Sequence, residues 1–261
     1  MAEAKTSVAH KPVWVDLSTS DAEAARNYYA KLFDWKVEVN PDPQYGGYAL
    51  AKIAGKDVAG IGPKQSAEAP SAWTVYIGST DVADTAKKTE ATGGKVVVPV
   101  MAVGDQGAMA IVQDPSGAVF GIWQSQNMTG AETTGAPNTY GWAELNSRGV
   151  EKAIPFYKKV FGWGEKKSDM GQDQGEYTEF LAGGESIAGG MEMNPMVPAE
   201  VPSYWMVYFN VDDVDKAFKK ATETGGKEML APQEFPGGRF AILQDPQGAA
   251  FGLLKMSDGG R

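Results

Sequence analysis

The feature that most constrains the fold is an internal repeat that covers nearly the whole chain. The segment WVDLSTSDAEAARNYYAKLFDW (14–35) returns as WAELNSRGVEKAIPFYKKVFGW (142–163), 128 residues later. QDPSGAVFGIWQ (113–124) returns in the same way as QDPQGAAFGLLK (244–255), 131 residues later. Self-similarity at a fixed spacing indicates that one structural unit occurs twice.

The repeat also sets the domain organisation that we predict. The two copies span residues 12–125 and 139–256, and the polar segment 126–138 has the composition of an exposed linker. We expect residues 1–11 to be a flexible tail and residues 257–261 to be a second tail. The sequence leaves open whether the chain forms a homodimer and whether each copy closes its own site or completes that of the other.

The residue types that the chain lacks exclude several kinds of chemistry. It has no cysteine, which removes disulfides, thiolate metal sites and cysteine nucleophiles. The single histidine, His10, lies in the polar amino-terminal segment, where we expect it to be exposed, so the body of the fold has no Ser-His-Asp triad. A formal net charge of -9 without a basic stripe argues against nucleic acid as a partner. No segment has the apolar length of a signal peptide or a membrane span, so we expect no membrane partner and predict a cytoplasmic location.

Each copy reads as two modules of one strand, one helix and three strands. In the first copy, Ser20 and Glu23 predict a capping box for the first helix, and the second helix is expected to open near Asp81. Pro155 lies inside the first helix of the second copy, where a kink is expected. The predicted fold is α+β, with two domains that each pair two βαβββ modules into curved mixed sheets with the helices outside.

This module order, together with STSDAEAARNYYAKLFDW and the closing DPSGAVFG, resembles the vicinal oxygen chelate superfamily. That superfamily includes glyoxalases, bleomycin-resistance proteins and extradiol dioxygenases, and the tandem form is most similar to an actinobacterial branch that carries a hydroxylase label. The resemblance covers both copies almost end to end. It implies the fold but no single activity, because the superfamily supports many functions on one scaffold.

The resemblance also implies where a metal ion would bind. Metal-dependent members place His, Gln or Glu ligands on four strands, and three of these positions fall on Trp14, Thr74 and Gly121, and again on Trp142, Met206 and Gly252. The fourth falls within 58–62 or 187–191, where Ala and Gly stand. Apart from the weak Thr hydroxyl and Met thioether, none of these side chains can hold a divalent ion tightly. We therefore predict no metal site and no cofactor.

Strand alternation gives an independent view of the same positions, because successive side chains point to opposite faces. One parity is apolar and is predicted to pack against the helices: Val15, Leu17, Val75, Ile77, Phe120 and Ile122, then Ala143, Leu145, Val207, Phe209, Phe251 and Leu253. The other parity faces the concave side in the family and is predicted to bind the ligand: Trp14, Thr74, Tyr76, Gly121, Trp123, Trp142, Met206, Tyr208, Asn210 and Gly252. Asp16 and Glu144 share this face and are the candidate catalytic residues, as general bases or as partners of a cationic group.

Several of these residues have a second interpretation. Glycine within a strand often marks the close approach of a ligand. In the alternative interpretation, Gly121 and Gly252 only relieve crowding under Trp14 and Trp142, and these two rings fill the concave face themselves as core. Tyr76 and Tyr208 could donate a hydrogen bond to a ligand carbonyl, or they would lie at the rim with their hydroxyls in water. Asp16 and Glu144 would bond a backbone N–H or face water. The Gly60-Ile61-Gly62 segment is interpreted as a turn.

The function that these features favour is metal-free binding of a small hydrophobic or aromatic molecule. One alternative is an enzyme, either a glyoxalase-like lyase acting on methylglyoxal adducts or a hydroxylase or dioxygenase, with acid-base chemistry at Asp16 or Glu144. The other alternative is a protein whose outer surface binds a partner while its sites are relics.

Overall fold

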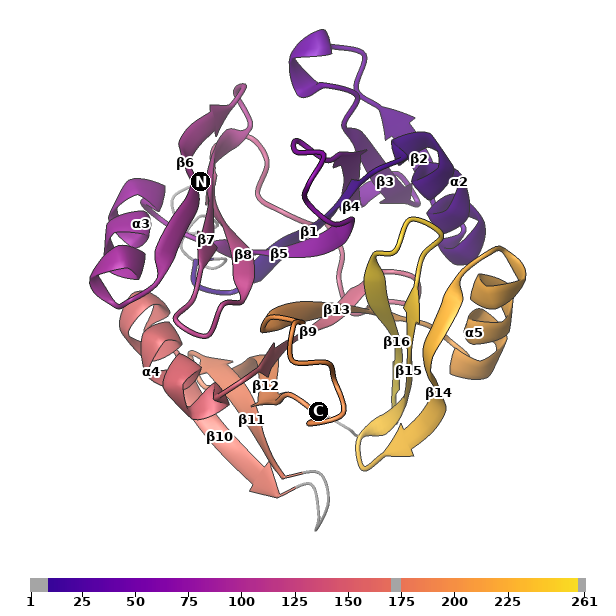
Figure 1. The fold of residues 1–261 in the computed structure, drawn as a ribbon. Coiled ribbons are helices and arrows are strands. Elements are labelled where there is room, and N and C mark those ends of the chain that lie inside the picture. The colour runs from indigo at the N-terminus through magenta and orange to yellow at the C-terminus, as the bar shows by residue number, and fades with distance from the viewer. Residues whose placement is uncertain (1–8, 170–174, 258–261) are drawn as a thin grey trace. The chain divides into compact units, whose positions relative to one another are not determined.

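The computed structural model describes residues 9–169 and 175–257, in which each copy of the repeat forms one eight-stranded mixed sheet (Figure 1). The tails predicted at 1–11 and 257–261 therefore lie largely outside the described residues. The first copy contains β1 (Pro12–Thr19), α2 (Ala22–Phe33), β2 (Lys36–Val39), the 3-10 helix η1 (Pro43–Tyr45), β3 (Ala49–Ile53), β4 (Lys56–Pro63), β5 (Ala72–Gly78), α3 (Val82–Ala91), β6 (Lys95–Val103), β7 (Gly107–Gln113) and β8 (Val119–Ser125). The second contains β9 (Tyr140–Ser147), α4 (Val150–Phe161), β10 (Gly164–Asp169), β11 (Glu176–Ala182), β12 (Glu185–Glu192), β13 (Tyr204–Asn210), α5 (Val214–Glu223), β14 (Lys227–Phe235), β15 (Gly238–Gln244) and β16 (Ala250–Met256).

The strand order is the same in both sheets. It runs β2-β3-β4-β1-β5-β8-β7-β6 in the first and β10-β11-β12-β9-β13-β16-β15-β14 in the second. Within a module the first strand is parallel to the last, as β1 is to β4, and the remaining pairs are antiparallel. The predicted α+β fold of paired βαβββ modules is confirmed. None of the described helices is long and apolar enough to cross a membrane.

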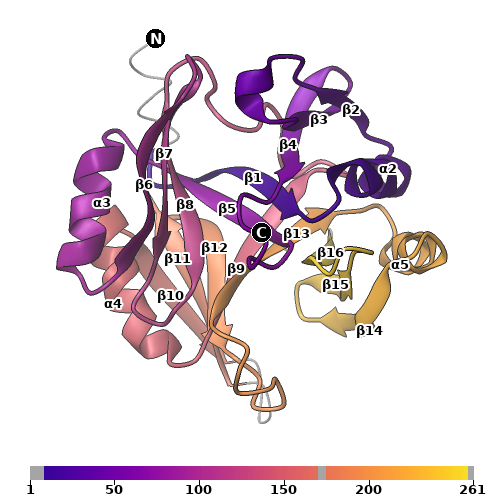
Figure 2. The ribbon, with the colours of Figure 1, turned by 45° about the horizontal axis from the view of Figure 1, so that its top comes forward.

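The compact packing units of the chain do not follow the two copies. Unit 1 combines residues 75–130 with 143–205 and the described residues before Trp14, and unit 2 combines 14–74 with 131–142 and the chain from Met206 onward. Accordingly, α3 lies beside α4 within unit 1 and α2 beside α5 within unit 2 (Figures 1 and 2). Each unit therefore joins one module of the first copy to one module of the second.

The repeated Asp-Pro-x-Gly turn makes this connection in unit 2. The Tyr29 hydroxyl of α2 donates to Asp245 Oδ2 at 3.1 Å and accepts the Trp73 indole N–H at 2.9 Å. The other oxygen of Asp245 accepts the backbone N–H groups of Gln247 and Ala249, both at 2.9 Å. Burial raises the pKa of Asp245, and burial together with this carboxylate raises the pKa of Tyr29 well above its usual range. One carboxylate thus closes its own turn and holds a helix of the other copy.

Unit 1 contains the same network built from the equivalent residues. Tyr157 of α4 donates to Asp114 Oδ2 at 2.8 Å and accepts the Trp205 indole N–H at 2.9 Å. Asp114 Oδ1 accepts the backbone N–H groups of Ser116 and Ala118 at 2.8 and 3.0 Å. The turn is repeated in the sequence because each copy uses it to bind the first helix of the other copy.

The predicted core is confirmed. All twelve residues assigned to the helix-facing parity are at most 1% exposed. The predicted capping box is wrong, because Asp21 caps α2 by accepting the Ala24 N–H at 3.0 Å, and the Ser20 N–H donates to the Ser71 hydroxyl instead. Asp81 caps α3 as expected. Pro155 lies within α4, which runs without interruption from Val150 to Phe161.

Candidate functional site

The face of the strands that points away from the helices carries the predicted site residues, and we refer to it as the helix-free face. In unit 2 it holds a hydrogen-bonded chain of three side chains. The Trp14 indole N–H donates to the Tyr48 hydroxyl at 3.0 Å, and this hydroxyl donates to Asp16 Oδ2 at 3.3 Å. Burial, and next the charge of Asp16, raise the pKa of Tyr48 well above its usual range, so that the phenol keeps its proton. The chain holds a buried indole, Trp14 being 6% exposed, beside a half-buried phenol and a half-buried carboxylate.

Sequence reasoning missed Tyr48. It directly precedes β3, and Leu50 two residues later lies opposite Gly60 in the register between β3 and β4. Gly60 in turn lies opposite Asp16 in the register between β4 and β1. Side chains alternate between the two faces of a strand, and Ala49 and Ala51 are fully buried on the face that meets the helices. The same alternation would have placed Tyr48 on the opposite face, with Asp16. The interpretation of Gly60 and Gly62 as turn residues is wrong, since both lie within β4.

Tyrosine rings cover the glycines of the helix-free face. A Cβ atom on Gly60 would overlap the Tyr48 ring, one on Gly121 would overlap Tyr76, and one on Gly252 would overlap Tyr208. Tyr76 and Tyr208 lie opposite these glycines on neighbouring parallel strands and are only 6% and 5% exposed. Gly121 and Gly252 therefore do relieve crowding, as the second interpretation proposed. The rings above them are those of Tyr76 and Tyr208, however, and not those of Trp14 and Trp142. The rim position considered for Tyr76 and Tyr208 is also wrong.

These positions do not fit a divalent metal ion. Trp14, Gly121 and Gly252 offer no ligand atom, and the tyrosine rings fill the space into which a carboxylate at either glycine would project. Met206 is 2% exposed, and Thr74 and Trp142 are half-buried. Within residues 9–169 and 175–257, no group of three or more His, Cys, Asp or Glu side chains could hold a metal. We therefore derive no chemistry from a metal at this site.

In unit 1 the helix-free face carries carboxylates. Glu144 on β9 and Glu179 on β11 flank Gly189 of β12 in the register of the second sheet. Asn146 donates to Glu144 Oε1 at 3.3 Å. Glu179 accepts from Ser186 and pairs with Lys166 at 3.0 Å, and these contacts lower the pKa of Glu179.

Tyr204 is a second residue of this face that the sequence analysis missed. Burial and next the charge of Glu144 raise its pKa. Its place two residues before Met206 on β13, and so on the same parity, was the available signal.

The predicted residues are divided between the units. Unit 2 holds Trp14, Asp16, Thr74, Trp142, Met206, Tyr208, Asn210 and Gly252, and unit 1 holds Tyr76, Gly121, Trp123 and Glu144. The two candidate catalytic residues, Asp16 and Glu144, therefore belong to different units. The Asn210 side chain lies against Gly141, and its backbone bonds to that of Asn138 and Thr139, which places it at the end of β13.

His10 is not an exposed tail residue, so that expectation is wrong. It is partly buried, its Nδ1 lies 2.7 Å from the Phe161 carbonyl oxygen, and its own carbonyl accepts the Trp163 indole N–H. Asn138 has the same role in unit 2, where its carbonyl accepts the Trp35 indole N–H at 2.7 Å. The single histidine therefore fixes the start of β1.

The fold and the site together define a tandem protein built from paired βαβββ modules. The chain belongs to the Glyoxalase/Bleomycin resistance protein/Dioxygenase superfamily, whose family model matches residues 11–122 and 139–253. This confirms the resemblance inferred from the sequence.

Relatives with curated names cover nearly the whole chain. "Putative glyoxylase CFP32" of Mycobacterium bovis is 39% identical over 249 residues, which are 94% of each protein. "Anthracycline biosynthesis protein DnrV" of Streptomyces peucetius is 34% identical over 262 residues, covering 95% of this chain and 94% of that protein.

Solved structures share the fold at low sequence identity. A Mn(II)-bound glyoxalase from Novosphingobium aromaticivorans matches with a TM-score of 0.63 and 18% identity, covering 96% of this chain and 84% of that one. The 2,3-dioxygenase LapB from Pseudomonas sp. KL28 matches with a TM-score of 0.65 and 12% identity, covering 94% and 92%.

Proposed function

We propose that this protein binds a small planar aromatic molecule on its helix-free faces without the help of a metal ion. The observation that carries the proposal is the chain of Trp14, Tyr48 and Asp16, in which an indole ring is held beside a phenol and a carboxylate. Aromatic rings bind planar ligands through their faces, and a single polar group fixes the orientation.

Two further observations support the proposal. Trp14, Trp142, Gly121 and Gly252 stand at four of the positions where metal-dependent members carry ligands, and tyrosine rings cover the two glycines. The relative named for anthracycline biosynthesis is 34% identical along nearly the whole chain, and anthracyclines are planar polycyclic aromatic compounds.

The test is a titration with 1,8-dihydroxyanthraquinone, a neutral planar probe, followed by tryptophan fluorescence and calorimetry. Asp16→Asn is expected to weaken binding about tenfold or more, because a hydrogen bond to a charged group contributes about 1.5–3 kcal/mol. Asp84→Asn is the matched control, since Asp84 is an exposed carboxylate on α3 paired with Lys88. Equal affinity in Asp16→Asn and wild type would contradict the proposal, as would stoichiometric Ni, Zn or Fe in the purified protein.

A lyase activity is the second candidate, and the 39% identity to "Putative glyoxylase CFP32" favours it. In this case Asp16 or Glu144 would move the proton. Turnover of the methylglyoxal–glutathione hemithioacetal that disappears in Asp16→Asn or Glu144→Gln would establish it. Full turnover in both variants would remove it.

A further inference from the structure

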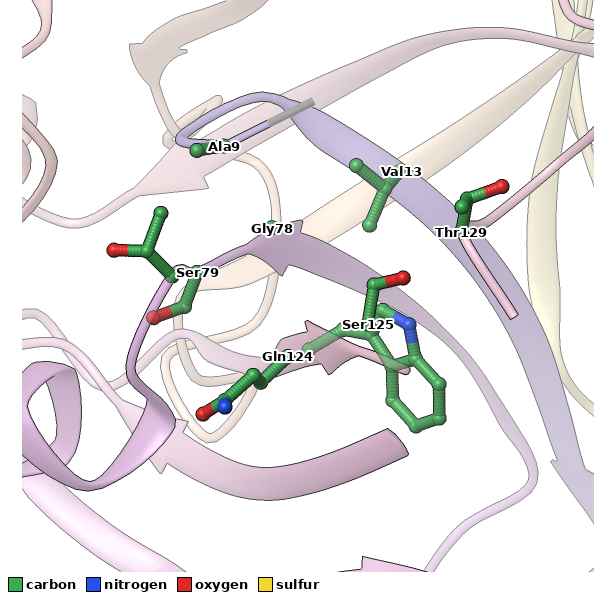
Figure 3. A pocket seen from close by; sticks show the side chains of 9 residues that line it. Ala9, Val13, Gly78, Ser79, Gln124, Ser125 and Thr129 are labelled. Carbon is green, nitrogen blue, oxygen red and sulfur yellow. The ribbon is translucent and has the colours of Figure 1, made fainter. Parts of the chain in front are cut away.

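A cavity of about 250 Å³ opens in unit 1 at the ends of β5 and β8 (Figure 3). Its lining includes Val13, Ser79, Trp123, Gln124, Ser125 and Thr129. A cavity needs only about 10–15 Å³ of such volume to hold one water, so this one has room for a small organic ligand. It lies outside the Trp14–Tyr48–Asp16 chain, which belongs to unit 2.

Two polar side chains of the lining are fixed by the start of α3. The Ser79 hydroxyl accepts the Asp81 N–H at 3.1 Å and is hydrogen-bonded to Thr85 at 2.8 Å. Gln124 Oε1 accepts the Val82 N–H at 2.8 Å. Because these groups and Asp81 already bond N–H groups at the start of α3, the cavity is not an anion site of the kind that helix N-termini form.

The Ser125 hydroxyl is a buried polar group of the cavity. Among residues 9–169 and 175–257 it has no hydrogen-bond partner. Figure 3 shows its side chain pointing toward the space between Val13 and Thr129. A buried polar group without a partner is costly, and buried hydroxyls in folded proteins are usually hydrogen-bonded. The hydroxyl therefore selects a ligand that brings one hydrogen-bonding group.

Trp123 and the absence of charge define the rest of the ligand. The Trp123 indole N–H donates to the Met128 carbonyl at 2.9 Å. Trp123 can therefore contact a ligand with its ring, while its N–H group is already hydrogen-bonded. None of the described residues that line the cavity is ionisable. A charged ligand would lose its hydration there without gaining a counter-ion, so a neutral ring is favoured.

The second copy does not repeat this lining. Leu254, Lys255 and Met256 stand where the first copy has Trp123, Gln124 and Ser125. The Lys255 ammonium group donates to the Asp212 carbonyl at 2.6 Å. The combination of an indole ring and a buried hydroxyl is thus a property of the first copy.

We propose that this cavity binds a neutral, phenol-sized ring compound carrying one hydroxyl group, with the ring against Trp123 and the hydroxyl bonded to Ser125. This inference goes beyond the function proposed above and does not depend on it.

The chain has no cysteine, so Ser125→Cys introduces a single thiol at the cavity. We expect saturating phenol to slow alkylation of this thiol by iodoacetamide about tenfold or more, as occupancy of the cavity requires. Ser66→Cys, on an exposed residue of unit 2, is the control and should react equally fast with and without phenol. Equal rates for Ser125→Cys with and without phenol would overturn the proposal.

If the thiol of Ser125→Cys does not react with iodoacetamide, binding of the ring compound is measured directly. Phenol, benzoate and benzylamine are compared at pH 7 by ligand-observed NMR on the unmodified full chain. Phenol should bind about tenfold more tightly than either charged compound, and Ser125→Ala should weaken phenol binding about fivefold. Glu223→Gln, at an exposed carboxylate on α5 that pairs with Lys219, should leave phenol binding unchanged. Benzoate or benzylamine binding as well as phenol, or an unchanged affinity in Ser125→Ala, would overturn the proposal.

Discussion

The first and third modules share one sequence pattern, yet their helix-free faces differ in chemistry. Leu50 lies opposite Gly60 in the first module, whereas Glu179 lies opposite Gly189 in the third. Ala72 at the start of β5 has Tyr204 as its counterpart at the start of β13. The second copy thus adds a carboxylate, in the third module, and a phenol, at the start of the fourth module, to faces that are more apolar in the first copy. The two faces need not bind the same molecule.

The buried networks that join the copies have not diverged in this way. Tyr29, Asp245 and Trp73 in unit 2 make the same hydrogen bonds as Tyr157, Asp114 and Trp205 in unit 1. A change at a buried carboxylate leaves several donors without an acceptor, whereas a change on a face that meets a ligand alters what is bound. The contrast indicates that packing keeps the residues of the buried networks the same in both units. The residues of the helix-free faces can differ between the copies.

The largest expected effect tests the part that the two units share. Asp114→Ala and Asp245→Ala should each lower the free energy of unfolding by about 3 kcal/mol, because each change leaves a tyrosine hydroxyl and two backbone N–H groups without their acceptor. Urea denaturation gives the values, with the exposed Asp84→Ala expected to change stability by less than about 0.5 kcal/mol. A large loss in only one of the two variants would show that the networks are not equivalent.

A smaller effect is expected at the hydrogen-bonded chain of the first module. Tyr48→Phe removes the acceptor of the Trp14 N–H and one donor to Asp16, which should cost about 1–2 kcal/mol. The same variant should weaken the anthraquinone probe. Tyr45→Phe, three residues earlier in η1, serves as the control for loss of a phenol in this segment. A Tyr48→Phe protein as stable as wild type would mean that the chain does not order this face.

The smallest effect sharpens the difference between the faces. Glu179→Gln should cost no more than about 1 kcal/mol at pH 7, because Glu179 is partly exposed and surface pairs contribute little. Ser186 and Lys166 lower its pKa in the folded state, so the stabilisation is present above the unfolded pKa of about 4.3 and is lost as the pH falls through the lower folded value. The free energies of unfolding of wild type and Glu179→Gln, measured by denaturation from pH 7 to pH 3, should therefore become equal at the acid end. Leu50→Gln, the matched change in the first module, should show a difference from wild type that does not vary with pH.

The sequence was sufficient for the fold because two signals agreed. The repeat fixed the module order, and strand alternation fixed the core, in which residues such as Phe120 and Phe251 are fully buried. The pairing of modules was out of reach, since the partner of Tyr29 is Asp245, 216 residues later, and local pattern carries no signal over that distance. The candidate site was found only in part. Tyr48 lies just outside its strand, and the rings over Gly121 and Gly252 depend on side-chain directions that periodicity does not specify.

The packing of Phe120 and Trp73 against the other copy has a consequence for biosynthesis. Phe120 packs on Phe156 and Phe161, and Trp73 packs on Phe209. At a translation rate of about 5–20 residues per second, Phe209 is synthesised roughly 7–27 s after Trp73. The nascent first copy therefore displays aromatic surface in the meantime, which makes it a natural client for chaperones and exposes it to aggregation if elongation stalls.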